Sequence, residues 1–239
     1  MPKPSFFRRK STYLIGVPVI VILAAVVAPF VYIHFIEGPA PKKFALTKPT
    51  AGASTGSTAT SGSATVSVDG AWKITTSSQA GYRVKETLFG QSNTAAGRTS
   101  AVKGNLTING ATVPAADFTV DLTTVKSDQA RRDAQFQGRI MDTATFPTAT
   151  FKLTKPIALT SVPGNLKPIT ASATGDLTLK GKTKSVTVEL KAQRNGDKIE
   201  VNGSIPVTFA DYGIDNPSGG PATTEDHGEL EFHLFFTRA

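Results

Sequence analysis

The feature that most constrains the fold is an alternation of apolar and polar side chains, with a period of two residues, that recurs through residues 66–239. In the clearest case Phe118, Val120 and Leu122 alternate with acidic and threonine side chains. Successive side chains of a strand point to opposite faces, so the pattern predicts antiparallel strands with one dry face and one wet face. The same pattern recurs at 72–74, 105–109, 186–191, 199–209 and 230–236.

Turn-forming sequences separate these segments. They are Asn109-Gly110, Pro163-Gly164-Asn165, Lys180-Gly181-Lys182 and Asn195-Gly196-Asp197. We expect about eight strands at hairpin spacing, and hence an all-β domain built as a barrel or a sandwich. A barrel of about eight strands is just wide enough for its own side chains or for one slender ligand. The pattern alone leaves open whether the domain is a barrel or a sandwich, and whether its interior is filled or hollow.

One stretch, Ser127–Phe151, breaks the alternation. Ser127 is a favourable residue for the start of a helix, and Asp128 suits the positive end of the helix dipole. Gly138 is placed to end the helix, and a Phe-Pro pair at Phe146 closes the stretch before the next strand. The sequence therefore predicts one short helix inserted between two strands.

A basic tail and a long uncharged segment open the chain. Residues 14–36 contain no Asp, Glu, Lys or Arg, and these 23 residues would span about 34 Å as a helix, enough for the core of a bilayer. Basic residues at 8–10 precede this segment, so the positive-inside rule places a tail of residues 1–13 in the cytoplasm. We expect a single-pass protein of the cell membrane whose folded domain is extracytoplasmic.

A cleaved signal peptide is the alternative interpretation of the same segment. An Ala-x-x-Ala run at residues 25–28 resembles a cleavage site. Pro29 would follow the cut directly, which disfavours cleavage, and the apolar run continues to Ile36. We therefore favour an uncleaved membrane anchor.

Residues 37–65 are expected to form a flexible, disordered linker. From Thr50 to Thr65 every residue is Thr, Ala, Gly or Ser, so the segment has almost no apolar surface to bury. Residues 1–48 hold seven Lys or Arg and one Glu, which is +6 of the formal charge of +8. Because the remaining 191 residues are close to neutral, the high net charge indicates a membrane anchor and no nucleic acid partner.

A set of short motifs occurs in a fixed order along the folded part of the chain. They are Trp72-x-Ile74, Gly81-Tyr82-Arg83-Val84-x-Glu86, Gly97-Arg98-Thr99, Val120-Asp121-Leu122, Ser127-Asp128, Arg132-Asp133, Phe146-Pro147-x-Ala149-x-Phe151, Gly175-Asp176-Leu177-Thr178-Leu179-x-Gly181-x-Thr183-Lys184 and Asp211-Tyr212-Gly213-Ile214. In this order they resemble the YceI family of bacterial lipid-binding domains, and the resemblance covers residues 66–239.

The resemblance implies an eight-stranded antiparallel, lipocalin-like barrel with one short helical insert and a polyisoprenoid chain held inside. Two departures stand out, because histidines common in the family are missing here. The segment after Ile74 reads Thr75-Thr76-Ser77-Ser78, and Lys180 precedes Gly181 where the family has a histidine.

The apolar strand faces are the main candidate for a ligand site. A packed core would need the same residues, and the resemblance favours a lipid-binding interior. Arg132 is a candidate contact for a lipid head group, whereas Arg131 and Arg139 are read as a solvated helix face. The predicted lining comprises Trp72, Ile74, Phe118, Val120, Leu122, Phe136, Phe146, Phe151, Val186, Val188, Leu190, Val207, Phe209, Phe232, Leu234 and Phe236.

No catalytic or metal-binding pattern is found in the sequence. The chain has no cysteine and only three histidines, with neither a Gly-x-Ser-x-Gly motif nor metal-ligand spacing. We expect no catalytic residues, no metal and no cofactor other than a bound isoprenoid or quinone-type lipid. The alternatives are a structural or interaction module of the cell envelope with a packed barrel, and an enzyme acting on an isoprenoid head group. The oligomeric state stays open.

Overall fold

The computed structural model describes residues 40–48, 67–220 and 222–239. The predicted cytoplasmic tail, the membrane helix at 14–36 and most of the linker lie outside these residues. Within the described ranges, no helix has the length and apolar character needed to cross a bilayer.

The described elements are twelve strands and four short helical segments. The strands are β1 (Gly70–Ile74), β2 (Gln79–Leu88), β3 (Gln91–Thr99), β4 (Val102–Asn109), β5 (Thr112–Asp121), β6 (Thr148–Leu153), β7 (Ile157–Ala158), β8 (Ile169–Leu179), β9 (Lys182–Asn195), β10 (Lys198–Thr208), β11 (Ala222–Thr224) and β12 (His227–Arg238). The helical segments are η2 (Leu122–Thr124), α2 (Ala130–Gln135), η3 (Phe136–Ile140) and η4 (Phe209–Tyr212).

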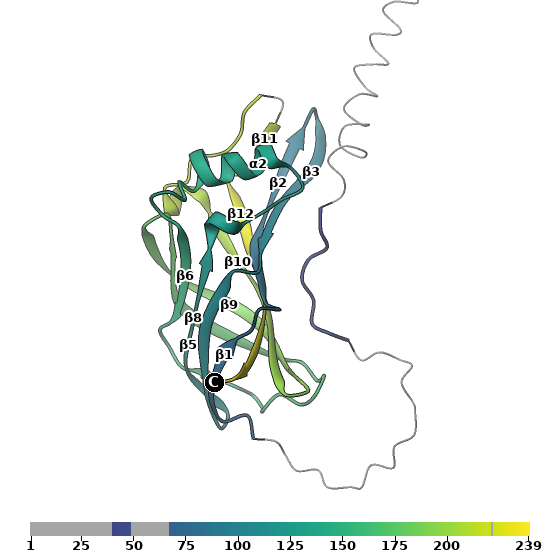
Figure 1. The fold of residues 1–239 in the computed structure, drawn as a ribbon, viewed down its shortest axis with the longest axis vertical. Helices are drawn as coiled ribbons and strands as arrows, with labels where there is room; N and C mark the ends of the chain where they lie inside the picture. Colours follow the sequence, from purple (N-terminus) through teal and green to yellow (C-terminus); the bar gives the residue numbers. More distant parts are fainter. Residues whose placement is uncertain (1–39, 49–66, 221) are drawn as a thin grey trace, which may run out of the picture.

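Eight of the strands close into an antiparallel barrel (Figure 1). The cyclic order is β1-β4-β5-β6-β8-β9-β10-β12, and the β1–β12 pairing closes the ring through partners such as Ile74 and Phe236. Closure leaves these strands no free edge along the ring, which is how a small barrel avoids edge-to-edge aggregation. The predicted all-β, eight-stranded antiparallel barrel with one helical insert is confirmed.

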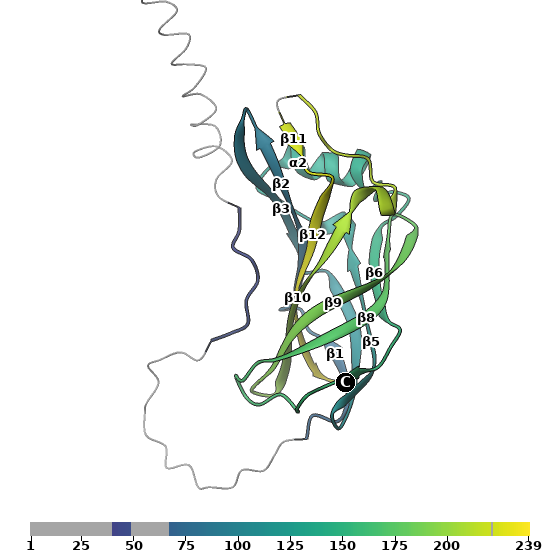
Figure 2. The same ribbon diagram turned by 180° about the vertical axis from the view of Figure 1, so that it is seen from behind.

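One edge of strand β12 pairs with β10, and the other edge pairs first with β2 and then with β1. The change of partner divides the barrel into a half beside β2 and a half beside β1. Near the C-terminus β12 pairs with β1, whereas its first half pairs with β2. Buried Ser78 contacts β12 at the point where its partner changes from β2 to β1. Its hydroxyl accepts from the Phe235 amide at 2.9 Å and lies 3.2 Å from the Phe235 carbonyl. The β2–β3 hairpin then extends beyond the ring, at the same end of the molecule as α2 (Figure 2).

The helical insert starts later than the sequence predicts. Helix α2 begins at Ala130, and its N-cap residue Gln129 makes no side-chain capping bond. Ser127 instead donates from its amide and from its hydroxyl to the carboxylate of Asp133, both at 2.7 Å. Gly138 does not end the helix, because it lies inside the π-helical turn η3, which continues to Ile140. The expected N-cap and helix end were therefore wrong, while the helix itself is confirmed.

Aromatic rings cross the barrel interior where opposing glycines make room. A Cβ atom added at Gly175 would lie 2.5 Å from the ring of Phe151, and one at Gly203 would lie 2.7 Å from the ring of Phe232. Such distances are far below van der Waals contact, so no larger residue fits at either position without moving the ring. These two rings help to define the middle of the barrel.

A fully buried carboxylate, Glu200, lies on the outer side of β10 between neighbouring strands. It accepts hydrogen bonds from Gln193 at 2.8 Å and from the Thr47 amide at 2.8 Å, and it lies 2.7 Å from Nε2 of His233. Burial raises the pKa of this carboxyl, but the hydrogen bonds from Gln193, Thr47 and His233 outweigh it and hold the pKa below its usual value. The ionised form is therefore the one that the fold favours.

Replacing Glu200 by glutamine should make the free energy of unfolding depend less on pH in the acid range. The folded pKa lies below the ordinary value of 4.5, so the carboxylate stabilises the fold fully above about pH 4.5 and loses this effect as the pH falls through the folded pKa. Urea unfolding of wild type and Glu200→Gln between pH 3 and 7, at roughly one-unit steps, measures the difference. The same pH dependence of the free energy of unfolding in both proteins below about pH 4.5 would contradict the lowered pKa of Glu200.

Candidate functional site

A cavity of about 970 Å³ occupies the half of the barrel that carries the helical insert. Its walls come from β2, β3, β5, β6, β8, β10, β11 and β12, and from the side of α2 and η3 that faces the barrel. Most of the lining is apolar, and it includes Val84, Val120 and Leu177. We call this space the upper pocket. Its volume lies near the top of the range for small-molecule sites, which is about 300–1,000 Å³.

The exposed members of the lining mark the mouth of the upper pocket. They lie on the β2–β3 tip at Phe89, on the helical insert at Arg131, Gln135 and Arg139, and on the loop 218–220. Phe89 is an exposed large apolar side chain, with half of its surface in contact with solvent. The mouth therefore carries both apolar and cationic groups, which suits a surface that meets lipid.

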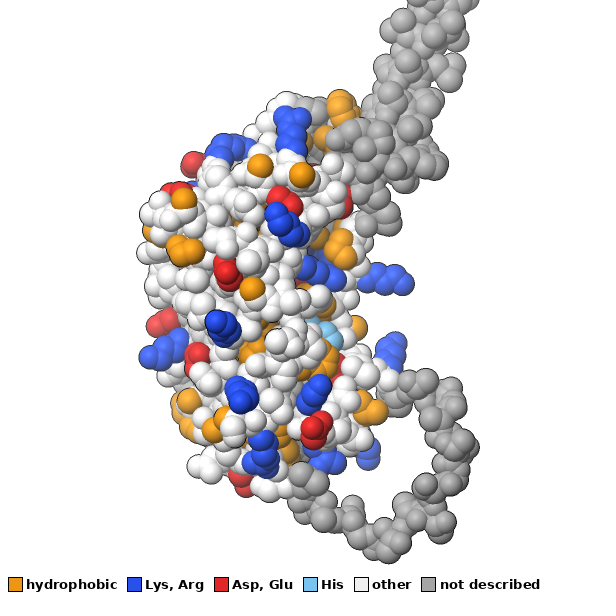
Figure 3. All heavy atoms as spheres, viewed as in Figure 1, with side chains coloured by type: hydrophobic (Ala, Val, Ile, Leu, Met, Phe, Trp, Pro, Cys, Tyr) orange, Lys and Arg blue, Asp and Glu red, His pale blue; other side chains and the backbone are white. Residues whose placement is uncertain are grey.

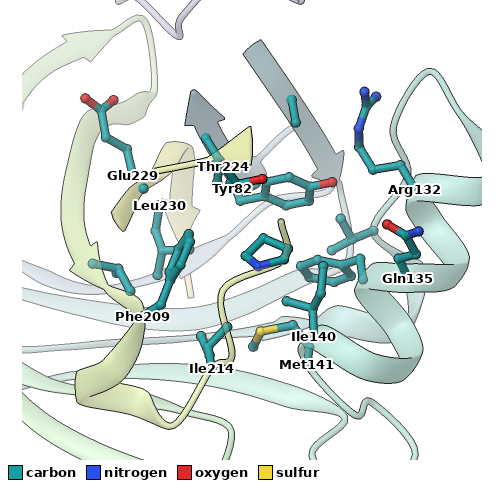
Figure 4. A pocket seen from close by; sticks show the side chains of 18 of the residues that line it. Tyr82, Arg132, Gln135, Ile140, Met141, Phe209, Ile214, Thr224, Glu229 and Leu230 are labelled. Carbon is teal, nitrogen blue, oxygen red and sulfur yellow. The ribbon is translucent and has the colours of Figure 1, made fainter. Parts of the chain in front are cut away.

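Three polar side chains approach one another on the helix side of the pocket (Figure 4). The ring of Tyr82 stacks on Phe136 with a centroid distance of 4.9 Å and an interplanar angle of 9°. Arg132 forms ion pairs with Asp128 and, at 3.4 Å, with Glu86. Burial raises the pKa of the Tyr82 hydroxyl, so this group remains a neutral hydrogen-bond donor at physiological pH. Together with the Gln135 amide these groups offer donors beside the mouth.

An aromatic floor closes the inner end of the upper pocket. The ring of Phe118 lies 5.4 Å from the ring of Phe151 and 5.4 Å from that of Phe232. Beyond this floor lies a second cavity of about 90 Å³, which we call the lower chamber. Phe118 and Phe232 line both cavities, so they separate the two spaces.

The structure distributes the predicted lining residues over both cavities. The upper pocket is lined by Phe118, Val120, Leu122, Phe136, Val207, Phe209 and Phe232, and also by Arg132. The lower chamber is lined by Phe118, Phe151, Val188, Leu190, Phe232, Leu234 and Phe236.

Four predicted lining residues border neither cavity. Trp72 is buried near the C-terminal end of the barrel, where its indole donates to the Val68 carbonyl at 2.8 Å. Phe146 packs against the β8–β9 turn, because a Cβ at Gly181 would lie 2.7 Å from its ring. Ile74 and Val186 are half-buried and pack against the outer parts of the core. These side chains support the wall of the barrel.

Several lining residues were missed in the sequence, although most carried the same signal. Ala80, Tyr82, Val84 and Leu88 follow the period of two along β2, as do Leu177 and Leu179 along β8. Ile140, Met141 and Ile214 come from helical and loop segments, for which the strand pattern gives no guide. The period of two would thus have found the strand members of the set.

No metal centre is formed by the residues that the structure describes, since no three His, Asp or Glu side chains come together. On the face shown in Figure 3, basic and acidic side chains are interspersed over the barrel wall. The expected absence of a metal, of catalytic groups and of a nucleic acid partner stays a prediction.

Fold and pocket together define a class of protein: a closed antiparallel barrel with an apolar interior that opens at one end. A family model described as a YceI-like domain matches residues 72–236. The chain therefore belongs to the family of YceI-like domains, and the resemblance in its ordered motifs is confirmed.

Two solved structures have the same fold. BcnA from Burkholderia cenocepacia is 21% identical, with a TM-score of 0.55 over 68% of this chain and 98% of BcnA. A protein from Saccharophagus degradans, described as a polyisoprenoid binding domain implicated in plant cell wall breakdown, is 17% identical, with a TM-score of 0.56 over 70% of this chain and 98% of its own. A comparison with curated proteins gave no match.

Proposed function

We propose that the protein binds the chain of an isoprenoid lipid in the upper pocket and keeps the lipid's head group at the mouth. The observation that carries this proposal is the 970 Å³ cavity, which runs from a partly exposed mouth to an aromatic floor. A packed structural barrel has no need of such a space, because protein interiors otherwise fill to crystal-like density. The polyisoprenoid binding described for the S. degradans neighbour, which shares the fold, supports the same ligand class.

The apolar lining supplies the affinity. Each buried methylene contributes about 0.8 kcal/mol, so a chain of a few isoprene units gains enough to bind tightly without any polar contact. The pocket needs only the right shape and an apolar surface for this. The proposed roles are storage, transport or protection of the lipid, and none of them requires catalysis.

The donors beside the mouth favour a head group that accepts hydrogen bonds. Tyr82 and Gln135 can donate to a quinone carbonyl or a phosphate oxygen, and Arg132 adds positive charge. Arg132 already pairs with Glu86 and Asp128, so it enters the proposal as a neighbour that orients the head group. Arg131 and Arg139 are exposed at the mouth and can approach the same group from the solvent side.

We further propose that residues 14–36 anchor the protein as a single-pass membrane helix with the barrel outside the cytoplasm. The uncharged 23-residue length and the basic residues before it support this placement. A tether to the bilayer would keep the mouth close to the source of an insoluble ligand. Residues 14–36 would thus make the membrane a second binding partner, besides the isoprenoid lipid.

Replacing Tyr82 by phenylalanine should weaken binding of a quinone by about 2- to 10-fold, the range expected for one lost hydrogen bond. Stacking on Phe136 is preserved, so affinity for squalene, which has no polar head group, should not change. Lipid titrations on both proteins measure the two affinities. An equal loss for quinone and squalene would show that Tyr82 acts only by packing.

Competition among defined lipids tests the ligand class. The full chain, in detergent, is titrated with an isoprenoid quinone, a polyprenyl phosphate and a saturated acyl lipid of similar length. We expect the two isoprenoids to bind at least tenfold more tightly than the acyl lipid, a difference of about 1.4 kcal/mol or more. Equal binding of all three would contradict an isoprenoid site, and no binding of any would contradict a lipid site.

A further inference from the structure

A nine-residue segment outside the barrel, Ala40–Lys48, runs along the barrel wall (dark purple in Figure 1). We call this segment the strap. It has no strand partner, and its contacts come from side chains on β2, β3, β9, β10 and β12. The strap is part of the predicted linker 37–65 and lies between the proposed membrane helix and residues 49–65, so its position determines how the barrel is held relative to the anchor.

The C-terminal half of the strap is fixed by a buried polar cluster. The Thr47 amide and hydroxyl donate to Glu200 at 2.8 and 3.0 Å, and the Thr47 carbonyl accepts from Gln193 at 2.9 Å. Glu200 and Gln193 are almost wholly buried, with 0% and 1% of their surface exposed. The backbone N–H and the backbone C=O of one residue, Thr47, are thus both hydrogen-bonded by buried side chains, which is the arrangement of a built peptide-binding site.

The N-terminal half of the strap is held by two arginines. Arg83 donates to the Pro41 carbonyl at 2.5 Å, and Arg98 donates to the Lys42 carbonyl. The Arg98 guanidinium also lies 3.9 Å from the centre of the Phe44 ring, which places it in cation–π contact. Buried Glu231 pairs with both arginines from behind, at 3.4 and 2.8 Å, and so fixes their orientation.

The direction of the strap follows from these contacts. Its first residues lie beside Arg83 and, through an ion pair of Lys43 at 2.6 Å, beside Glu229, which lines the upper pocket. Thr47 lies beside Glu200, whose strand partner on β12 is Phe235, towards the opposite end of the barrel. From its first residue to its last, the strap therefore leads the chain from the half of the barrel that contains the mouth to the closed half, so the start of the strap, next to the proposed anchor, lies on the mouth side.

We propose that the strap and its groove form an internal docking site that holds the mouth of the upper pocket towards the membrane. The proposal rests on the membrane anchor of the proposed function. With the strap docked, about four residues separate the anchor from the barrel, a span of at most about 15 Å. With the strap released, the tether of residues 40–66 has a root-mean-square reach of about 30 Å and sets no orientation.

The docked strap is tested by hydrogen exchange on the full chain in detergent, with no membrane required. Thr47→Pro removes the amide donor but keeps an extended backbone, and Phe44→Ala removes the ring beneath Arg98. We expect the Thr47 amide, which donates to Glu200, to be protected in the wild type and to lose protection in Phe44→Ala alone, which keeps this amide; the double variant removes both contacts. Ala45→Ser, which changes an exposed side chain on the same strap, is the control and should keep the protection. A wild-type Thr47 amide that exchanges as freely as in an unstructured peptide would overturn the docking site.

The orientation is tested by energy transfer to the bilayer. The chain has no cysteine, so a single donor dye can be placed at Ser92→Cys near the mouth or at Asp197→Cys in the turn at the opposite end. The labelled full chain is reconstituted in phosphatidylcholine vesicles that contain a rhodamine-labelled lipid, and the vesicles are then floated. Transfer should be stronger from position 92 than from position 197, and the double strap variant should lose this difference.

Three other outcomes each count against a different part of the proposal. Equal transfer from both positions in floated wild-type vesicles would overturn the orientation and leave the anchor standing. A difference that persists in the double variant would show that the strap does not set it. A chain that does not float with the vesicles would overturn the anchor and the orientation together, whereas the exchange experiment still decides the docking site.

Discussion

Replacing Ala149 by tryptophan should lower the affinity for an isoprenoid lipid by about 100-fold while the barrel stays folded. Ala149 is buried on β6 opposite Val120, and its side chain borders the upper pocket. An indole placed there takes the space of three or four methylenes of the ligand, a loss of about 2.4–3.2 kcal/mol. Because the space is a cavity of about 970 Å³, the larger side chain meets little resistance from the protein itself.

Ala173→Trp is the matched control for this substitution. Ala173 is also buried, with 1% of its surface exposed, but it borders the lower chamber of about 90 Å³. Overpacking there should cost about 1–3 kcal/mol of the free energy of unfolding. Urea unfolding and lipid titration are measured on both variants. If Ala149→Trp is destabilised as much as Ala173→Trp and still binds lipid as the wild type does, the upper pocket is not the binding site.

Replacing Phe232 by alanine should remove part of the aromatic floor and join the upper pocket to the lower chamber. The ring lies 5.4 Å from Phe118 and over Gly203, so its loss leaves an opening that these neighbours cannot fill. The free energy of unfolding should fall by about 3–5 kcal/mol, as for other large core truncations. The variant should also prefer longer lipids, by about tenfold for every two further methylenes that enter the lower chamber.

Phe236→Ala separates the floor effect from the loss of core packing. Phe236 lies on the same strand, is equally buried at 4% exposure and borders only the lower chamber. We expect a similar loss of stability with no change in the preferred chain length. The two variants are compared by urea unfolding and by competition between a short-chain and a long-chain isoprenoid quinone. An unchanged preference in Phe232→Ala would mean that the floor does not limit the ligand.

The strand alternation predicted the barrel well because inward and outward faces are a property of the local backbone. It could not predict depth within the barrel, so Val120 and Val188 carried the same signal although they border different cavities. The size of the upper pocket depends on how α2 and η3, which supply part of its lining, pack against the strands. That is a matter of tertiary packing, on which the period of two has no bearing.

The polar contacts were harder to predict for a related reason. Ser127 has the composition of an N-cap, but in the structure the Asp133 carboxylate accepts from its amide and hydroxyl, and the helix begins three residues later. Thr47 and Glu200 are 153 residues apart in the sequence, and neither belongs to a recognisable motif. Their contact arises only because the strap lies against the wall of the closed barrel. Long-range hydrogen bonds of this kind leave no periodic signal.

The most direct test of the central claim is to identify what the purified protein carries. The full chain is purified in mild detergent, denatured and extracted with organic solvent, and the extract is analysed by mass spectrometry with Ala149→Trp prepared in parallel. We predict an isoprenoid lipid, close to one molecule per chain in the wild type and strongly reduced in the variant. Repeated wild-type preparations that contain no isoprenoid, or the same amount of lipid in both proteins, would contradict an isoprenoid-binding upper pocket.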